Sequence, residues 1–243
     1  MTETETIPDE TAGRRAAPPC SPNDPREWDA WAPYYAGEVD WLEEIHNPDL
    51  RELARPDGRR VLDIGCGTGR RALALFGAAA SLTAVDSSAG MAAAARENLR
   101  GLGGAQVLEM DIEREEFPPG LQFDAAVAVS TMHHIKEAGA ALERVKERLV
   151  PGGRLIIVDA VAGNPPLRAL GYYLEMLSRH SPLRLAAAFA RGFLLDTRLA
   201  RHKRREVHLT FAEFRRRYGE FLPGARCEVR HGIFGYLVWD KPA

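Results

Sequence analysis

The stretch Val61–Arg70, which reads VLDIGCGTGR, decides the fold of this 243-residue chain. An apolar run with the acidic residue Asp63 near its end leads into glycines at positions 65, 67 and 69, and a helical pattern follows. Such glycines allow a ligand to approach the backbone, and a helix N-terminus presents free N–H groups to an anionic group. The stretch therefore predicts a strand, a ligand-binding loop and a helix, in that order.

Strand-like and helical runs alternate from Arg60 to Asp159. The predicted strands read RVLDI, SLTAV, AQVLEM, FDAAVAV and GRLIIVD, and the helical patterns between them read RALALF, AGMAAAARENL and GAALERVKERL. This alternation is typical of βαβ units, in which helices cover both faces of a parallel sheet. The chain closes with ARCEVRHGI and FGYLVWDKP, which are close enough to form an antiparallel pair. The pattern predicts an α/β fold.

A second feature points to a nucleoside ligand. Asp86 ends the strand-like run after the glycines, at the separation from Gly65 at which a carboxylate reaches a ribose diol. A dinucleotide-binding oxidoreductase is the competing interpretation, but its GxGxxG pattern places the third glycine one residue later. Asp63 beside the glycines also suits a cationic ligand better than a pyrophosphate. S-adenosylmethionine, with its ammonium, sulfonium and ribose groups, fits both features.

On these residues the chain resembles the class I S-adenosylmethionine-dependent methyltransferases, in the type 11 branch similar to the ubiquinone and menaquinone-biosynthesis enzymes. The motifs VDSSAGM, MDI, STMHHI and LVPGGRLIIVD follow the first motif in the family's order. The resemblance covers about Trp28 to the C-terminus. It implies a Rossmann-like fold, with a seven-stranded, mostly parallel sheet, a terminal antiparallel β-hairpin and a helical lid.

The resemblance also implies a site for S-adenosylmethionine, with S-adenosylhomocysteine (SAH) as the product. The first motif would surround the methionine end, Asp86 would bind the ribose hydroxyls, and Asp111 and Ile112 would meet the adenine. The residues expected to bind the cofactor are Tyr35, Asp63, Gly65, Cys66, Gly67, Gly69, Asp86, Ser87, Met91, Asp111, Ile112 and Ser130.

Two histidines follow the fourth predicted strand, beside the expected position of the methyl group. A histidine can act as a general base near neutral pH. A His-His pair is nevertheless common at this place in the branch, which favours a packing role for at least one of them. The candidate catalytic residues are His134 and His133, and the candidate acceptor contacts are Tyr34, His133, Tyr172, Tyr173 and Met176.

Composition predicts three regions. Residues 1–25 are poor in large apolar side chains and are expected to form a disordered tail. Residues 26–55 are aromatic and helical in pattern, with a break expected at Pro33, and would form a cap. Residues 56–243 would form the methyltransferase domain, with a helical lid inserted at 163–217. This lid carries 12 Lys and Arg against 4 Asp and Glu, whereas residues 1–49 carry 3 Arg against 12 acids.

The net charge and the cysteines of the sequence argue against several kinds of partner and site. The formal net charge is −2, so overall charge gives no reason to expect DNA binding. Three widely spaced cysteines support neither a disulfide framework nor a zinc knuckle, and we expect no metal. The N-terminal sequence lacks a signal pattern and no stretch is apolar enough to span a membrane, so we expect a cytoplasmic protein. The oligomeric state is not predicted.

The apolar and basic lid favours a small or mid-sized, partly lipophilic organic acceptor, of the kind used in bacterial specialised metabolism. Two alternatives stay open: an RNA or protein methyltransferase that docks through the basic stretch at 198–208, and a cofactor-binding protein without transferase activity. RNA is disfavoured because no RNA-binding module is visible and STMH replaces an NPPY-like tetrapeptide. The sequence does not distinguish methylation of oxygen, nitrogen or carbon.

Overall fold

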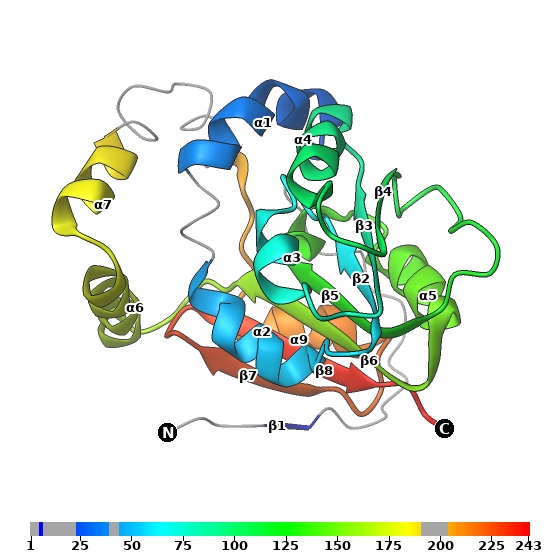
Figure 1. Ribbon diagram of the computed structural model, residues 1–243. Coiled ribbons are helices and arrows are strands. Elements are labelled where there is room, and N and C mark those ends of the chain that lie inside the picture. The colour runs from blue at the N-terminus through cyan, green and yellow to red at the C-terminus, as the bar shows by residue number, and fades with distance from the viewer. Residues whose placement is uncertain (1–4, 7–22, 39–43, 191–203) are drawn as a thin grey trace.

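The computed structural model describes residues 5–6, 23–38, 44–190 and 204–243. Its centre is a sheet whose parallel part follows the order β6-β5-β2-β3-β4 (Figure 1). Each of these strands coincides with an apolar run of the sequence, which confirms the predicted α/β fold. Their bounds are Arg60–Ile64 for β2, Ser81–Asp86 for β3, Ala105–Glu109 for β4, Phe123–Val129 for β5 and Leu149–Ala160 for β6.

The predicted terminal hairpin completes the sheet. Strand β8 (Phe234–Asp240) pairs antiparallel with both β6 and β7 (Arg226–Arg230), which confirms a seven-stranded, mostly parallel sheet. A two-residue strand, β1 (Glu5–Thr6), adds an eighth at the edge by pairing with β7. These two residues belong to the segment expected to be disordered. The remainder of that segment lies outside the described residues as far as position 22.

Side chains of the parallel strands alternate between two apolar layers, which is why each strand reads as a continuous apolar run. Val61 of β2 packs with α2 (Asn47–Ala54), α3 (Arg70–Leu75) and α4 (Ala89–Leu99) on one face. Leu62 packs with α5 (Ala138–Arg148) and α9 (Phe211–Gly219) on the other. Figure 1 shows α2 and α3 in front of the sheet and α9 behind it.

Helix α9 belongs to the core and not to the lid expected at 163–217. Phe214 and Tyr218 on α9 are fully buried against the sheet. Its start is fixed by a capping box, in which the Thr210 N–H donates to Glu213 Oε2 at 2.8 Å and Thr210 Oγ1 accepts from the Glu213 N–H. The outlying helices are α6 (Pro166–Arg179) and α7 (Pro182–Phe189). Residues 191–203 of the expected lid lie outside the described residues.

The break predicted at Pro33 is wrong, because α1 (Pro25–Glu38) continues through this residue. An internal proline costs a helix about 3 kcal/mol. Contacts with α4 offset this cost: Trp31 and Ala32 are buried against Met91, and Asp29 accepts a hydrogen bond from the Gly90 N–H at 2.8 Å. Tertiary packing therefore overrides the local preference that the sequence shows.

A network of ionisable side chains ties α6 to the rest of the protein. His231, in the turn between β7 and β8, places Nε2 2.6 Å from Asp49 Oδ2 on α2 and Nδ1 2.8 Å from Glu175 Oε2 on α6. Burial lowers the pKa of His231, but the hydrogen bonds to Asp49 and Glu175 outweigh burial and raise it. Arg230 also lies 2.6 Å from Asp49. Charge complementarity thus fixes α6 against the sheet.

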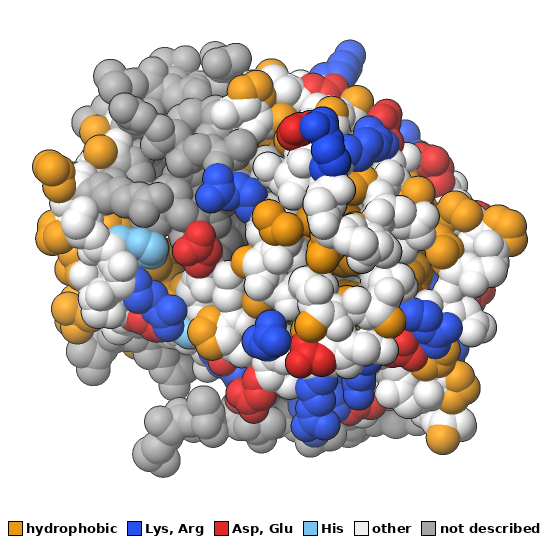
Figure 2. All heavy atoms as spheres, in the orientation of Figure 1, with side chains coloured by type: hydrophobic (Ala, Val, Ile, Leu, Met, Phe, Trp, Pro, Cys, Tyr) orange, Lys and Arg blue, Asp and Glu red, His pale blue; other side chains and the backbone are white. Residues whose placement is uncertain are grey.

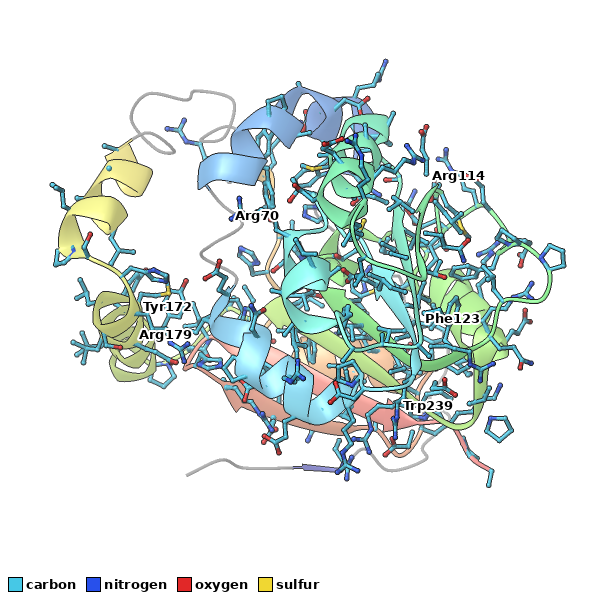
Figure 3. All side chains as sticks on the ribbon, viewed as in Figure 1. Arg70, Arg114, Phe123, Tyr172, Arg179 and Trp239 are labelled. Atoms are coloured by element: carbon cyan, nitrogen blue, oxygen red, sulfur yellow. The ribbon has the colours of Figure 1, made fainter. Side chains whose placement is uncertain are left out.

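Apolar contacts reinforce this attachment. Tyr172, labelled on α6 in Figure 3, places its ring 5.6 Å from that of Phe234 on β8, and Met176 packs against Ile45.

Among the described helices, none combines the length and the apolar character that a membrane crossing needs.

We predict that α6 loosens as the pH rises through the elevated pKa of His231. A histidine whose folded-state pKa is raised contributes its full stabilisation below its unfolded value, about 6.5, and loses it above the folded-state value. Hydrogen exchange of the α6 amides, corrected for the intrinsic rate, should therefore accelerate as the pH rises from the ordinary histidine pKa, about 6.5, through the raised pKa of His231.

His231→Gln cannot ionise and should remove this pH dependence, leaving α6 less protected than in the unmodified protein at pH values where His231 is protonated. Arg179→Ala is the matched control, because it removes only the partner of Glu175 within α6. Protection that stays constant with pH in the unmodified protein would contradict the prediction.

Candidate functional site

A pocket lies at the carboxyl ends of β2, β3, β4 and β5, with α1 on its wall. Strand β2 lies between β3 and β5. The chain adds β3 and β4 on one side of β2 and then crosses back to add β5 and β6 on the other side. Open parallel sheets bind ligands at such a switch point. The structure brings together in this pocket a large part of the predicted site, namely Tyr35, Gly65, Cys66, Gly67, Asp86, Ser87, Met91, Asp111, Ile112, Ser130 and His134.

The loop after β2 needs glycine for two different reasons. Gly65 has φ +63°, and a Cβ atom there would lie 2.3 Å from Thr131 Oγ1, so the loop and the end of β5 are in close contact. Gly67 has φ +54°, and its Cβ position meets nothing nearer than the Tyr35 ring at 3.9 Å. The backbone at Gly67 therefore faces open space in the pocket. Gly69 precedes α3 and packs against Ala95, away from the pocket lining.

Asp86 connects two loops of the site. Its Oδ2 accepts a hydrogen bond from the Gly67 N–H and its Oδ1 accepts one from the Ser88 N–H, both at 2.9 Å. Each carboxylate oxygen retains capacity for a further hydroxyl donor. Burial raises the pKa of Asp86 to about 6. Burial also raises the pKa of the Cys66 thiol, so this residue lines the pocket as a neutral group.

Asp29 of α1, which the sequence analysis did not identify, fixes the N-terminal cap over the pocket. Ser88 caps α4 by accepting from the Met91 N–H, and its hydroxyl donates to Asp29 Oδ1 at 2.7 Å. This contact holds α1 so that Trp28 and Tyr35 line the pocket. A contact between residues so distant in sequence leaves no local signal in a single chain.

The structure places Arg71 in the pocket lining and Asp63 behind it. The Asp63 side chain is 0% exposed, and its Oδ1 lies 3.6 Å from Nη2 of Arg71. Asp63 was expected to face a cationic ligand, whereas here it balances the charge of a guanidinium. The sequence analysis did not identify Arg71, although its position in the first turn after the glycines was the available signal. The pocket therefore offers a cation to an anionic ligand group.

Apolar side chains line the far end of the pocket. Met91, Met110 and Ile112 are buried and contribute to its lining. Flexible thioethers and an aliphatic side chain suit the faces of a flat aromatic base. Asp111 lines the same region, while its Oδ1 accepts from the Glu113 N–H at 2.9 Å. These positions agree with an adenine subsite, which stays a prediction.

The two histidines have different surroundings. Both lie on the 3₁₀ turn η2 (Met132–His134), with ring centroids 4.0 Å apart. His134 lines the pocket and makes an edge contact with Trp28 at 5.1 Å. His133 is not in the lining: its Nδ1 lies 2.8 Å from Oδ1 of the buried Asp159. Only His134 is therefore placed to meet a molecule in this pocket.

The structure does not bring the predicted acceptor residues of α6 to this pocket. Met176 is 3% exposed and belongs to the contact between α6 and Ile45, together with Tyr172. Tyr173 is 60% exposed on the outer surface of α6. Tyr34 lies within α1, but its side chain lies outside the described part of the structure. A role for these residues in acceptor binding stays a prediction.

Comparison with known proteins agrees with this geometry. Residues 61–153 match a family model described as a methyltransferase domain. An uncharacterized methyltransferase of Mycobacterium tuberculosis is 35% identical over 129 residues, a match that covers 53% of this chain and 64% of that protein. The chain therefore spans less than two thirds of the length of this relative.

Solved structures extend the likeness to nearly the whole chain. The DhpI–SAH complex has a TM-score of 0.61 at 21% identity and covers 90% of this chain and 95% of its own. The [4+2]-cyclase SpnF has a TM-score of 0.61 at 18% identity and covers 94% of this chain and 100% of its own. At these identities the likeness concerns the fold. Together with the match of residues 61–153 to a methyltransferase domain, it confirms the predicted resemblance: the chain has the fold of the class I S-adenosylmethionine-dependent methyltransferases.

Proposed function

We propose that this protein transfers a methyl group from S-adenosylmethionine to a small or mid-sized, partly lipophilic organic acceptor. The observation that carries the proposal is one pocket that combines an open glycine backbone, the Arg71 guanidinium, the Asp86 carboxylate and an apolar end. Its relatives named as methyltransferases and the DhpI neighbour solved with SAH support the same activity.

Each part of the pocket fits one part of the cofactor. Arg71 would pair with the methionine carboxylate and Asp86 would accept hydrogen bonds from the ribose hydroxyls. Because Gly67 has no side chain on its open face, the methionine part of the cofactor would lie against the backbone there. Met91 and Ile112 would contact the adenine. When bound, S-adenosylmethionine supplies an electrophilic methyl group on a sulfonium, whose leaving group is a neutral thioether.

The protein's own contribution is alignment and proton removal. Trp28 and Tyr35 cover the pocket from α1, which limits the access of water and restricts how an acceptor can lie. His134 lies in the same lining, where its imidazole would accept the proton of a hydroxyl or amine acceptor.

Helix α6 carries an exposed apolar face outside the pocket lining, within the segment from which the sequence analysis expects a lipophilic acceptor. Leu170, Tyr173, Leu174 and Leu177 recur at helical spacing on α6 and are all between 45% and 60% exposed. Figure 2 shows hydrophobic side chains along the edge of the molecule where α6 and α7 lie. The placement of the acceptor in bacterial specialised metabolism and of the protein in the cytoplasm stays a prediction from composition.

One ion pair favours a small acceptor over a polyanion. Arg205, at the end of the basic stretch, places Nη2 2.7 Å from Oε2 of Glu27 on α1. Arg205 is therefore paired with the acidic cap, and this pairing reduces the positive charge that the described part of the basic stretch offers to an RNA.

We predict that Asp86→Ala weakens SAH binding by about 1.5–3 kcal/mol, because it removes charge-assisted hydrogen bonds to the ribose. Hydroxyl donors favour the ionised carboxylate, so the affinity of the unmodified protein should also fall as the pH falls through about 6. Calorimetric titration measures both effects. Asp57→Ala, which removes an exposed carboxylate, is the control. Unchanged affinity in folded Asp86→Ala would refute the ribose assignment.

Arg71→Lys keeps a positive charge beside Asp63 but removes the planar donor pair that recognises a carboxylate. We expect its affinity for SAH to fall about tenfold or more, by loss of a bidentate pair. Its affinity for 5′-methylthioadenosine, which lacks the amino-acid group, should stay the same. Equal losses for the two ligands would show that Arg71 supports the fold of the pocket and does not bind the carboxylate.

His134→Ala should lower turnover by about 10²–10⁴ on a hydroxyl or amine acceptor, because it removes the base. SAH affinity should change by about twofold at most, because the ring is not assigned to the cofactor. Steady-state kinetics and SAH titration of the same preparation separate the two effects. Parallel losses in turnover and affinity would indicate a structural role for His134.

A further inference from the structure

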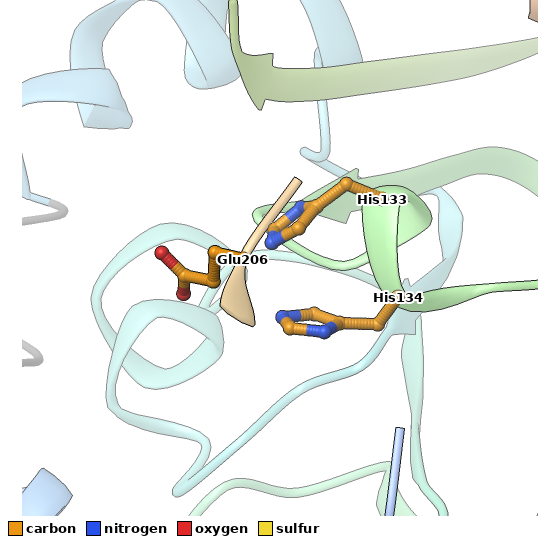
Figure 4. Close-up of side chains that lie close together, drawn as sticks. All are labelled: His133, His134 and Glu206. Atoms are coloured by element: carbon orange, nitrogen blue, oxygen red, sulfur yellow. The ribbon is translucent and has the colours of Figure 1, made fainter. Parts of the chain in front are cut away.

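Three side chains from two distant segments meet beside the cofactor pocket. His133 and His134 come from η2 and Glu206 comes from the segment before α9, and one potential ligand atom of each lies within 4.8 Å of the others. Figure 4 shows the two rings side by side with Glu206 facing them. We propose that these residues bind a divalent first-row transition-metal ion of the Zn²⁺ or Co²⁺ type.

The cluster is buried to an extent that needs a compensating interaction. His133 is 6% exposed, His134 is 7% exposed and the Glu206 side chain is 5% exposed. A carboxylate removed from water requires a cation or several hydrogen bonds. His208 Nε2 lies 3.5 Å from Glu206 Oε2, and the His208 side chain is 37% exposed. A metal ion bound by the three side chains would add a second positive charge beside the buried carboxylate.

The orientation of His133 is an independent sign of ligand binding. Asp159 Oδ1 lies 2.8 Å from Nδ1 of His133, and the Tyr218 hydroxyl donates to Asp159 Oδ2 at 3.3 Å. A carboxylate at Nδ1 places the proton on that nitrogen and leaves the lone pair of Nε2 exposed to a ligand. Nε2 is buried and has no hydrogen-bond partner among the described residues. Ligating histidines in metalloproteins are held by a carboxylate in the same way.

The ligand types select the class of ion. Two imidazole nitrogens and one carboxylate oxygen suit Zn²⁺, Co²⁺ or Fe²⁺, whereas Mg²⁺ and Ca²⁺ prefer oxygen ligands throughout. An ion of this class that takes four ligands and is held by three side chains would keep its fourth position open for water or substrate. This assignment replaces our expectation from the sequence, where only cysteine spacing was considered and Glu206 had no visible relation to the histidine pair.

The position of the cluster suggests what the ion would do. His134 belongs both to the cluster and to the pocket lining, so an ion bound there would be close to the acceptor side of the site. Such an ion would bind a hydroxyl or carboxylate of the acceptor and lower the pKa of the hydroxyl, so in the ion-bound protein His134 would serve as a ligand and not as the base. This catalytic role rests on the proposed function, whereas the binding of the ion does not.

The test is a Co²⁺ titration of tag-free protein treated with a chelator, followed by visible absorption, with Zn²⁺ competition. We expect one ion per chain and nitrogen-ligated Co²⁺ bands that Zn²⁺ abolishes. His133→Ala and Glu206→Gln should each weaken Co²⁺ binding about tenfold or more. Asp159→Asn should weaken it by about 10–100-fold, because the His133 ring would no longer be held in its orientation. His180→Ala, a histidine at the end of α6, should bind as the unmodified protein does.

SAH titration of every variant checks that the pocket is folded and keeps the two proposals apart. Absence of Co²⁺ and Zn²⁺ binding by protein that binds SAH would overturn the metal site. Binding that persists unchanged in both His133→Ala and Glu206→Gln would also overturn it. Loss of SAH binding with retained metal binding would instead contradict the proposed function.

Discussion

The site depends on the Asp86 carboxylate, which accepts hydrogen bonds from the backbone of Gly67 and of Ser88. These two bonds hold the loop after β2 beside the start of α4. Ser88 then binds Asp29, so the cap helix α1 takes its position from the same point. Because burial disfavours the charge of Asp86, a ligand that donates to this carboxylate gains more than it would from an exposed one. This arrangement suits the ribose diol that we propose as its ligand.

Much of the fold was predictable because its determinants are local. The apolar runs that form β2, β3 and β5 are continuous in sequence, since both faces of these strands are buried. Most of the pocket residues that were identified, such as Gly65, Asp86 and Ser130, lie next to strand ends, where the topology brings them together. By contrast, the helix through Pro33, the core position of α9 and the relation of Glu206 to the histidine pair depend on contacts between distant segments. A single sequence carries no signal for such pairs.

Proteins that share this fold can differ in the reaction that they catalyse. The [4+2]-cyclase SpnF and DhpI have the same TM-score of 0.61 to this chain, so the fold does not by itself determine the chemistry. The residues of this chain that would set its reaction lie in or beside the pocket: His134, the buried pair of His133 and Asp159, and Glu206 before the start of α9. They are the part of the described structure in which selection of an acceptor would reside.

The central claim is that a methyl group moves from S-adenosylmethionine to an organic acceptor. Incubation of the protein with methyl-deuterated S-adenosylmethionine and a panel of lipophilic hydroxyl, amine and carboxylate acceptors, followed by mass spectrometry, tests this most directly. The account predicts a product that carries the labelled methyl group, formed in equal amount with SAH. A folded protein that binds SAH, yet forms neither labelled product nor SAH with the panel or with extracts of the source cells, would contradict it.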